Sequence, residues 1–359
     1  MYAELQKMLE AEVIVEVGAS EWVSPVLMVR KADGTWRFCV DYRLLNDRTK
    51  PWWHPTPDMN QLINCMATAF FKTSIDLNSG YWQIGVRPGD KEKLTFICPM
   101  GLYTWNRMPF GAKNAGATFQ YAMDKILEGY QWKRAPTYID NIGIWSKKGE
   151  DHVKIVDEVL TLFENAGATL NAKKCEFGCR KISYLGLVVD IDGVYLSADR
   201  VKAIVEYPEP KNAQEMLRFL GMASWCRRFI QNFSQIAAPL YGMTKKTQPF
   251  MWTDRARLAF GKLKQAMSEV GVMKLFEFGK PLVVRTDASK EGVGAVLLQR
   301  DDEGVLRVIE YASEKSNMAQ ARWTAERMEA YAIVWALKRW RDYLLGGRFT
   351  LQTDNRALI

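Results

Sequence analysis

Four consecutive residues, Tyr138-Ile139-Asp140-Asn141, most strongly constrain what this chain can fold into. Their apolar and β-prone neighbours predict a strand, a tight turn and a second strand over residues 138–145. A second acid, Asp76, lies at the predicted end of another strand. Acids embedded in apolar strand sequence are costly unless they are paired or bound to metal. Asp76 and Asp140 are therefore a candidate divalent-metal site, although two surface acids at loop ends would give the same spacing.

Length and composition limit the class of protein. The chain has 359 residues, enough for two to three domains, and 48% of them are hydrophobic. The net charge of +8 suits a polyanionic partner, although many soluble proteins are equally basic. No apolar run is long enough to span a membrane, and the charged first 16 residues predict no signal peptide, so we expect an intracellular protein. Six scattered cysteines and two histidines lack the usual spacing of a zinc site.

Periodic patterns predict an α+β fold. Apolar stripes indicate helices at residues 2–12, 114–128 and 151–166, and Asp33-Gly34 between two β-rich runs indicates a hairpin. After a break near Tyr207-Pro208, Asn212 and Glu215 predict the start of a helical region that extends to residue 270. Three strands (282–287, 293–299 and 306–312), a helix at 324–345 and a strand at 349–354 are expected to follow.

Three further acids form a second candidate metal site. Asp287 closes an apolar strand, and Asp354 ends the last predicted strand. Glu329 falls on the apolar stripe of the helix between them, and a glutamate on a buried face needs a reason. The three acids could converge on one metal pair. The alternative is that they bind no metal and are simply a partly exposed glutamate and two aspartates at strand ends.

The chain resembles a known family through motifs that occur in order along nearly all of its length. It looks like the reverse transcriptase–RNase H region of the Pol polyprotein of gypsy-type long-terminal-repeat retrotransposons (Metaviridae). The motifs that carry the resemblance are Asp33-Gly34-Thr35-Trp36-Arg37, DLNSGYWQ at 76–83, Met108-Pro109-Phe110-Gly111, the tetrad at 138–141, Tyr184-Leu185-Gly186, Phe219-Leu220-Gly221, Thr286-Asp287-Ala288-Ser289 and Thr353-Asp354.

The resemblance implies a fold and a reaction. The expected fold is a right-hand polymerase, with fingers and palm over 1–205 and a helical thumb or connecting region over 206–272, followed by a C-terminally truncated RNase H-like α/β domain over 273–359. The expected activity is RNA-directed DNA polymerisation by two-metal transfer of deoxynucleoside triphosphates onto a primer 3′-hydroxyl, with Mg²⁺ or Mn²⁺ as the metal. The expected partner is an RNA or DNA template–primer duplex, the expected location is cytoplasmic retroelement particles or the nucleus, and the oligomeric state is left open.

The resemblance also implies roles for individual residues. In the polymerase, Asp76, Asp140 and Asn141 would be catalytic, with the Leu77 carbonyl as a further metal ligand. The nucleotide would meet Arg30, Lys31, Arg37, Tyr81 as a ribose gate, Phe110 and Gly111. The primer and duplex would meet Leu185, Gly186, Arg218, Arg227 and Arg228. Asp287, Glu329 and Asp354 would hold the metals of the nuclease.

The chain departs from the family pattern in three respects, and the first two favour a rival interpretation. Asn141 stands where the family usually has a second aspartate, which removes one negative charge beside the metals while an asparagine still suits the turn. The chain ends before the fourth acid of the family's nuclease, so RNase H activity is expected to be impaired, and protease and integrase regions are absent. The rival is thus a catalytically inactive, nucleic-acid-binding remnant, whereas Tyr81 and the nuclease tail argue against an RNA-copying RNA polymerase.

Overall fold

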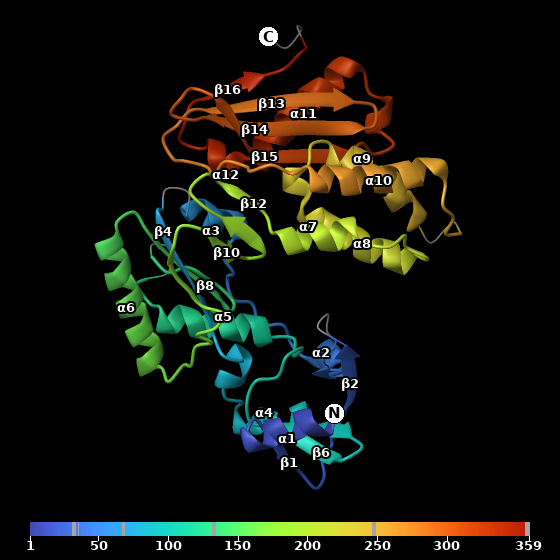
Figure 1. Cartoon of the computed structure of the whole chain (residues 1–359). Coiled ribbons are helices and arrows are strands. Elements are labelled where there is room, and N and C mark those ends of the chain that lie inside the picture. The colour runs from blue at the N-terminus through green and yellow to red at the C-terminus, as the bar shows by residue number, and fades with distance from the viewer. Residues whose placement is uncertain (31–33, 35, 67–68, 131–133, 246–248, 356–359) are drawn as a thin grey trace. The chain divides into compact units, whose positions relative to one another are not determined.

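The computed structural model describes residues 1–30, 34, 36–66, 69–130, 134–245 and 249–355 (Figure 1). The chain forms two compact units, one of Met1–Leu62 with Ala69–Ile182 and the other of Ile63–Thr68 with Ser183–Ile359. Helices and strands are mixed in both, as the sequence predicts. Among the described residues no helix is long and apolar enough to cross a membrane.

The first unit contains a five-stranded sheet in the order β1-β6-β5-β2-β3. Its strands are β1 (Ile14–Glu16), β2 (Ser24–Arg30), β3 (Trp36–Val40), β5 (Phe96–Cys98) and β6 (Gly101–Trp105). The predicted hairpin is confirmed as β2 and β3, which pair antiparallel. One face of the sheet buries Phe96, Tyr103 and Trp105 against α1 (Tyr2–Glu10), which is the first predicted helix.

A second sheet of the same unit carries the first candidate site. Its order is β7-β8-β4-β9, with β4 (Phe71–Asp76), β7 (Thr137–Tyr138), β8 (Asn141–Ser146) and β9 (Glu176–Cys179). Two helices, α5 (Ala115–Ile126) and α6 (Gly149–Asn165), confirm the predictions at 114–128 and 151–166 and pack their apolar stripes on this sheet. Phe119, Ile142 and Phe163 are almost fully buried where they meet, so burial of apolar surface fixes the strand register.

The remaining elements of the first unit are short and lie around these sheets. They are α2 (Arg43–Arg48), α3 (Met59–Cys65), which extends into the second unit, α4 (Pro88–Lys91) and two 3₁₀ turns, Gly80–Gln83 and Glu92–Leu94.

The second unit begins with a small sheet and a helical region. The sheet has the order β10-β11-β12, with β10 (Ile182–Tyr184), β11 (Leu187–Val189) and β12 (Val194–Leu196). The helices are α7 (Ala198–Val205), α8 (Ala213–Trp225), α9 (Phe233–Met243) and α10 (Asp254–Ser268). Asn212 caps α8 by accepting a hydrogen bond from Glu215 N, as predicted. The continuous helix expected over 212–270 is wrong in detail, because a 3₁₀ turn at Arg227–Phe229 and the segment before Asp254 interrupt it.

A four-stranded sheet completes the second unit. Its order is β15-β14-β13-β16, with β13 (Leu282–Ser289), β14 (Gly292–Arg300), β15 (Leu306–Lys315) and β16 (Phe349–Gln352). A short 3₁₀ turn, Gln320–Arg322, precedes α11 (Ala325–Arg339), which packs against β13 and β14 (Figure 1). The predicted helix at 324–345 is interrupted at Trp340, and α12 (Arg341–Leu344) follows.

Helix α9 packs on β15, where Ser234 N donates to Ser313 Oγ at 2.9 Å. These contacts group the helical region with the four-stranded sheet in one compact unit. The predicted boundaries at 205 and 272 stay predictions.

Candidate active sites

The register of β4 and β8 brings the two acids of the first candidate site together. Asp76, the last residue of β4, lies opposite Asn141, the first residue of β8. Because Tyr138 also pairs with Asn141, Ile139 and Asp140 form a two-residue turn between β7 and β8. Ile139 has φ +56°, a left-handed conformation that a β-branched residue adopts only at a cost. The turn therefore presents Asp140 beside Asp76 at the end of the sheet.

Both acids remain accessible to solvent. The Asp76 side chain is 38% exposed, with Lys174 Nζ at 3.8 Å from Oδ1, an open ion pair that contributes little to stability. Asp140 is exposed, and Asn141 Nδ2 donates to its Oδ1 at 3.1 Å. The amide of Asn141 thus occupies one oxygen of Asp140, where a second carboxylate would repel it.

The donor set fits Mg²⁺ only if substrate supplies further ligands. Among the residues that the structure describes, no three His, Cys, Asp or Glu side chains form a group that could hold a metal ion. Two carboxylates, those of Asp76 and Asp140, and the backbone carbonyl of Leu77 remain as oxygen donors. Mg²⁺ commonly binds one or two carboxylates and completes its octahedron with water and phosphate oxygens. The residues present therefore fit a metal that arrives with a phosphorylated substrate.

Tyr81 lies next to this pair of acids. Its ring packs on Phe119 at 5.1 Å and on Phe110 at 4.8 Å between centroids. Partial burial, and then the negative charge of Asp140, raise the pKa of Tyr81 above its ordinary value. A side chain at Gly80 would overlap the Phe119 ring at 2.9 Å, so glycine is needed where the Tyr81 turn meets α5. The aromatic ring is held in one place between the acids and the Phe110 loop.

Two asparagines fix the loop that carries Phe110 and Gly111. Asn46 Nδ2 donates to Gly111 O at 2.9 Å, and Asn46 Oδ1 accepts from Lys113 N at 2.8 Å. In the other direction, Asn114 accepts from Trp52 N and donates to Lys50 O, both at 3.0 Å. Phe110 is 54% exposed at the tip of this loop. The resemblance assigns roles to Phe110 and Gly111 but none to the asparagines that position them.

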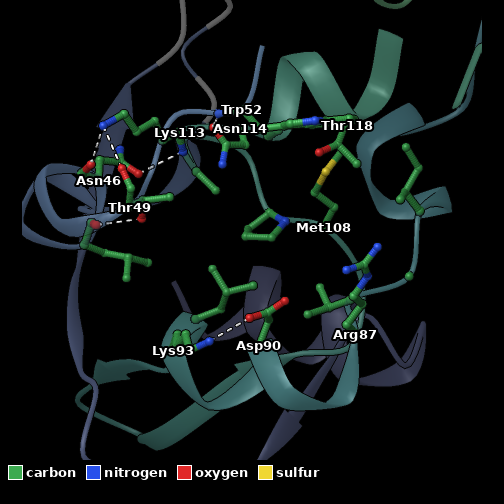
Figure 2. A pocket seen from close by; sticks show the side chains of 18 of the residues that line it. Asn46, Thr49, Trp52, Arg87, Asp90, Lys93, Met108, Lys113, Asn114 and Thr118 are labelled. Carbon is green, nitrogen blue, oxygen red and sulfur yellow. Dashed lines mark hydrogen bonds and ion pairs between the residues drawn. The ribbon is translucent and has the colours of Figure 1, made fainter. Parts of the chain in front are cut away.

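A pocket of about 710 Å³ lies on another side of the same loop (Figure 2). Asn46, Thr49 and Lys113 line one wall, and Arg87, Asp90 and Lys93 line the opposite one. Lys113 Nζ donates to Thr49 O at 2.8 Å, and Lys93 pairs with Asp90 at 2.7 Å. Neither Asp76 nor Asp140 lines this pocket, so it is separate from the candidate catalytic site.

The basic hairpin presents its predicted phosphate contacts on two faces. Val29 pairs with Arg37 and Arg30 pairs with Trp36, so the side chains of Arg30 and Arg37 point to opposite sides of the hairpin. Both arginines are exposed. Lys31 lies outside the described residues. The structure therefore does not bring Arg30 and Arg37 together for one ligand.

The second candidate site follows from the pairing of β13 with β16. Arg285 lies opposite Gln352, and two residues further along each chain come Asp287 and Asp354, so the two aspartates are level with each other. Asp287 continues β13, whereas Asp354 lies beyond the end of β16 and not within it. Glu329 is 8% exposed on α11, and its Oε1 accepts from Ala288 N at 3.2 Å.

Burial, and then the charge of Asp354, raise the pKa of Glu329 above its ordinary value, with a smaller contribution from Asp287. Its second oxygen, Oε2, is buried and has no hydrogen-bond partner in the described part of the chain. An orphaned carboxylate oxygen facing two more acids suits a cation, although the three do not form a closed set of metal ligands. The predicted burial of Glu329 is confirmed, while Ile333 of the predicted stripe is only half-buried.

The predicted primer contacts Leu185 and Gly186 form the tight turn between β10 and β11. Both have positive φ, +51° and +74°, which matches the two-residue turns that join antiparallel strands. A side chain at Gly186 would collide with the Arg200 guanidinium, which stacks on the Trp225 ring at 3.6 Å. The Arg200 side chain from α7 therefore lies between this turn and Trp225 of α8.

The three predicted duplex-binding arginines differ in accessibility. Arg218 is exposed on α8. Arg227 is exposed but donates to Ser313 O at 2.7 Å. Arg228 is 9% exposed and stacks over Phe229, so its burial argues against the predicted contact with a duplex. Sequence position alone could not separate these roles, because the 3₁₀ turn rotates Arg227 and Arg228 to different sides.

Gln120 is a residue that the motifs do not reveal. It is 1% exposed on α5, accepts from Ile139 N at 2.8 Å and donates to Thr137 O at 3.1 Å. A signal existed in the sequence, since residue 120 falls three before Met123 and seven before Leu127 on the apolar stripe. A polar residue at such a position needs buried partners.

Two protein families match separate parts of this chain. The family described as "Reverse transcriptase (RNA-dependent DNA polymerase)" matches residues 29–189, and that described as "RNase H-like domain found in reverse transcriptase" matches residues 252–351. The Tf2-7 and Tf2-8 transposon polyproteins of Schizosaccharomyces pombe are each 36% identical over 100% of this chain. The chain spans 27% of the length of these relatives.

Solved structures show the same fold. The foamy viral protease-reverse transcriptase in complex with RNA/DNA hybrid has a TM-score of 0.82 at 22% identity, over 98% of this chain and 47% of that chain. The same protein in complex with dsDNA has a TM-score of 0.82 at 22% identity, over 99% of this chain and 74% of that chain. The predicted fold class is confirmed: the chain has a reverse-transcriptase domain followed by an RNase H-like domain, and along its whole length it is similar to transposon polyproteins.

Proposed function

We propose that this chain is the RNA-directed DNA polymerase, with its RNase H-like domain, of a gypsy-type long-terminal-repeat retrotransposon. The observation that carries the proposal is the pairing of Asp76 with Asn141, which brings Asp140 and Asp76 to one end of a sheet beside Tyr81. The similarity to Tf2 transposon polyproteins supports the element type, and retroelement particles inside the cell are the proposed location.

In the proposed reaction a primer 3′-hydroxyl attacks the α-phosphate of a deoxynucleoside triphosphate, and pyrophosphate leaves. Bound Mg²⁺ would supply Lewis-acid stabilisation of the attacking and leaving oxygens. Asp76, Asp140 and the Leu77 carbonyl would hold it, and Asn141 would orient Asp140 through the 3.1 Å hydrogen bond. Arg37 on the hairpin would bind the triphosphate, and Tyr81 would exclude a 2′-hydroxyl by occupying its place.

The foamy viral relatives bind dsDNA and RNA/DNA hybrid, which supports a nucleic-acid duplex as partner here. Exposed Arg218 and the Leu185-Gly186 turn are the proposed contacts with the duplex and the primer end. In the RNase H-like domain, Asp287, Glu329 and Asp354 are the proposed metal ligands for cleavage of the RNA strand of a hybrid.

One observation favours the rival function of an inactive, nucleic-acid-binding protein. Asn141 contributes no charge and its amide occupies one oxygen of Asp140, so the site has fewer anionic ligands than a pair of turn aspartates would give. If this position acts on the metal through Asp140, the loss in activity is about 10–100-fold. If it binds the metal directly, the native chain is inactive.

Primer extension on poly-rA/oligo-dT separates the two functions. The native chain, Asp140→Ala and Asn141→Asp are compared in Mg²⁺ and in Mn²⁺, with Asp157→Ala on the exposed side of α6 as the matched control acid. Extension by the native chain and the control, lost in Asp140→Ala and increased in Asn141→Asp, is the expected result. No extension by the native chain together with extension by Asn141→Asp would support the inactive form. No extension by either protein would contradict the proposed function.

A further inference from the structure

We propose that Gln120 is a positioning residue for the turn that carries Asp140, and that Asp124, itself held by His54, fixes the orientation of Gln120. The inference rests on the proposed polymerase function and deepens it. It adds three side chains, none of which belongs to the predicted site, to the elements that set the geometry between Asp76 and Asp140.

The catalytic turn needs support from outside its own strands. Ile139 is β-branched, and its φ of +56° is a left-handed conformation that such a residue rarely adopts. Strand β7 has only the two residues Thr137–Tyr138, so its pairing with β8 supplies few ladder hydrogen bonds. Such strained backbone persists where surrounding contacts over-determine it.

Gln120 supplies two of these contacts from α5. Its Oε1 accepts from Ile139 N at 2.8 Å, and its Nε2 donates to Thr137 O at 3.1 Å. The two bonds lie on either side of Tyr138 and attach both the short strand and the first turn residue to the helix. Because Gln120 is 1% exposed, water does not compete for these bonds.

The bonds to the turn require one orientation of the Gln120 amide, since a rotation by 180° would exchange its donor and its acceptor. Asp124 sets this orientation from one helical turn further along α5. Its Oδ1 accepts from Gln120 Nε2 at 3.0 Å, which is possible only when the NH₂ group points that way. Four residues of separation place the two side chains on the same face of the helix.

His54 holds Asp124 from a separate segment of the chain. Its Nε2 lies 2.6 Å from Asp124 Oδ2, and its side chain is 19% exposed. The imidazole also packs edge-on against Tyr121 at 5.5 Å between ring centroids. An unbroken series of hydrogen bonds therefore runs from His54 through Asp124 and Gln120 to the residue that precedes the catalytic Asp140.

This series predicts a defect in the chemical step rather than in binding. Without Gln120 the turn relaxes, and the distance between Asp140 and Asp76 is no longer fixed. A misplacement of about 1 Å can cost on the order of 10²-fold in rate. None of these three side chains belongs to the proposed duplex contacts, so affinity for the duplex is expected to stay unchanged.

The first test is pre-steady-state incorporation of a single nucleotide with the duplex in excess over the protein, so that the burst amplitude counts the active fraction and the burst phase gives the rate constant. Gln120→Met keeps the side-chain length and removes all three hydrogen bonds. We expect the rate constant to fall by about 10–100-fold per active site, with an unchanged Kd for the duplex and a higher Mg²⁺ requirement. An unchanged rate constant with a smaller burst would mean that Gln120 only stabilises the fold, and would overturn the proposal.

Gln299→Met is the matched control. Gln299 is 2% exposed and also makes three hydrogen bonds, one from Glu277 N and two to the carbonyls of Glu277 and Lys280. It belongs to the RNase H-like sheet. The same loss of a buried amide is therefore expected to lower stability but not the rate constant of polymerisation.

The role of Asp124 and His54 is tested by combining substitutions. Asp124→Ala and His54→Ala are each expected to lower the rate constant by roughly 3–10-fold in the native background and to have no further effect in Gln120→Met. Losses that multiply in the double variants would show that the three residues act independently, which contradicts the proposed series.

Hydrogen exchange at the Ile139 amide tests the proposal without any need for catalysis. The native amide is expected to be protected, with exchange at least about tenfold faster in Gln120→Met and intermediate rates in Asp124→Ala. If Ile139 loses protection but the native chain never extends a primer, the proposed function fails and this inference stands. If the native chain extends primers and Gln120→Met changes neither exchange nor rate, the inference fails and the function stands.

Discussion

The two acidic sites of this chain place their carboxylates in opposite environments. In the reverse-transcriptase domain, Asp76 and Asp140 are accessible to solvent at the end of a sheet, and a hydrogen-bonded turn holds one of them. In the RNase H-like domain, Glu329 is buried on a helix, and one of its oxygens has no hydrogen-bond partner among the described residues.

The difference shows which feature of each site destabilises the folded state. At the proposed polymerase site the acids stay hydrated, so the energetic cost lies in the left-handed backbone of Ile139, to which Gln120 is hydrogen-bonded. At the proposed nuclease site Asp287 and Glu329 lie on regular strand and helix backbone, so the cost lies in the buried carboxylate of Glu329. Substitutions in the first site are therefore expected to change mainly rate, and those in the second to change stability as well.

Loss of either set of acids is expected to have the largest effect. It should also distinguish the activity of one domain from that of the other. Asp140→Ala should lower polymerisation by on the order of 10³-fold or more while leaving cleavage of an RNA–DNA hybrid intact, and Asp287→Ala should do the reverse. Both activities are measured on one labelled hybrid. A parallel fall of both activities in either variant would contradict two independent sites.

Removal of the Tyr81 ring should weaken selection of the sugar. Tyr81 is packed between Phe110 and Phe119, so Tyr81→Ala opens space beside the bound nucleotide. We expect discrimination against ribonucleotides, as a ratio of kcat/KM values, to fall by about 10–100-fold. Tyr81→Phe keeps the ring and serves as the matched control. Equal discrimination in both variants would exclude Tyr81 as the gate.

Neutralising Glu329 should stabilise its domain. Since burial raises the pKa of this carboxyl, its ionised form at neutral pH destabilises the folded state, and Glu329→Gln removes that charge. The free energy of unfolding in urea at pH 7.5 should rise by on the order of 1 kcal/mol, while hybrid cleavage is lost. Exposed Glu326 on the same helix gives the control Glu326→Gln, for which no gain is expected. A loss of stability in Glu329→Gln would contradict this account of the site.

The smallest effect concerns a histidine beneath the polymerase sheet. His152 is buried between Thr73 Oγ1 at 2.8 Å and Ser146 Oγ at 3.1 Å, and burial lowers its pKa below the ordinary value of 6.5. The unfolded chain then binds a proton more readily than the folded one, so stability is lost as the pH falls below about 6.5. Urea unfolding at pH 7.5 and 5.5 should show a loss of on the order of 1 kcal/mol, which His152→Gln reduces. An equal loss in both proteins would mean that other groups cause it.

Local sequence rules could predict the elements but not their cross-connections. Periodicity predicted α5 and α6, and the β-rich pattern around Asp140 predicted the turn, because apolar burial and turn geometry are encoded by neighbouring residues. The stripe also predicted the burial of Glu329. The break at Trp340 and the 3₁₀ turn after α8 escaped prediction, since tertiary contacts decide where a continuous helical pattern is interrupted.

Contacts between side chains far apart in the sequence could not be predicted either, because they also depend on tertiary structure. The opposite faces of Arg30 and Arg37 depend on the hairpin register, and the burial of Arg228 depends on which way a 3₁₀ turn points. Gln120 bonds to the turn at Ile139 across 19 residues, and His54 bonds to Asp124 across 70 residues. The apolar stripe indicates that Gln120 is buried, but no local pattern identifies its partners or singles out His54.

Affinity cleavage by Fe²⁺ tests the central claim most directly, because Fe²⁺ bound in place of Mg²⁺ generates radicals that cut the backbone beside the metal. With ascorbate and peroxide, in the presence of a template–primer duplex and a deoxynucleotide, the account predicts cuts near residues 76 and 140 that excess Mg²⁺ suppresses and Asp140→Ala abolishes. Gln120→Met should weaken and spread the cuts near residue 140. Cuts near residue 287, where Fe²⁺ would bind at the proposed nuclease site, should stay unchanged. Cuts near residues 76 and 140 that persist in Asp140→Ala, or a native chain that is not cut near these two residues, would contradict a metal site built by Asp76 and Asp140.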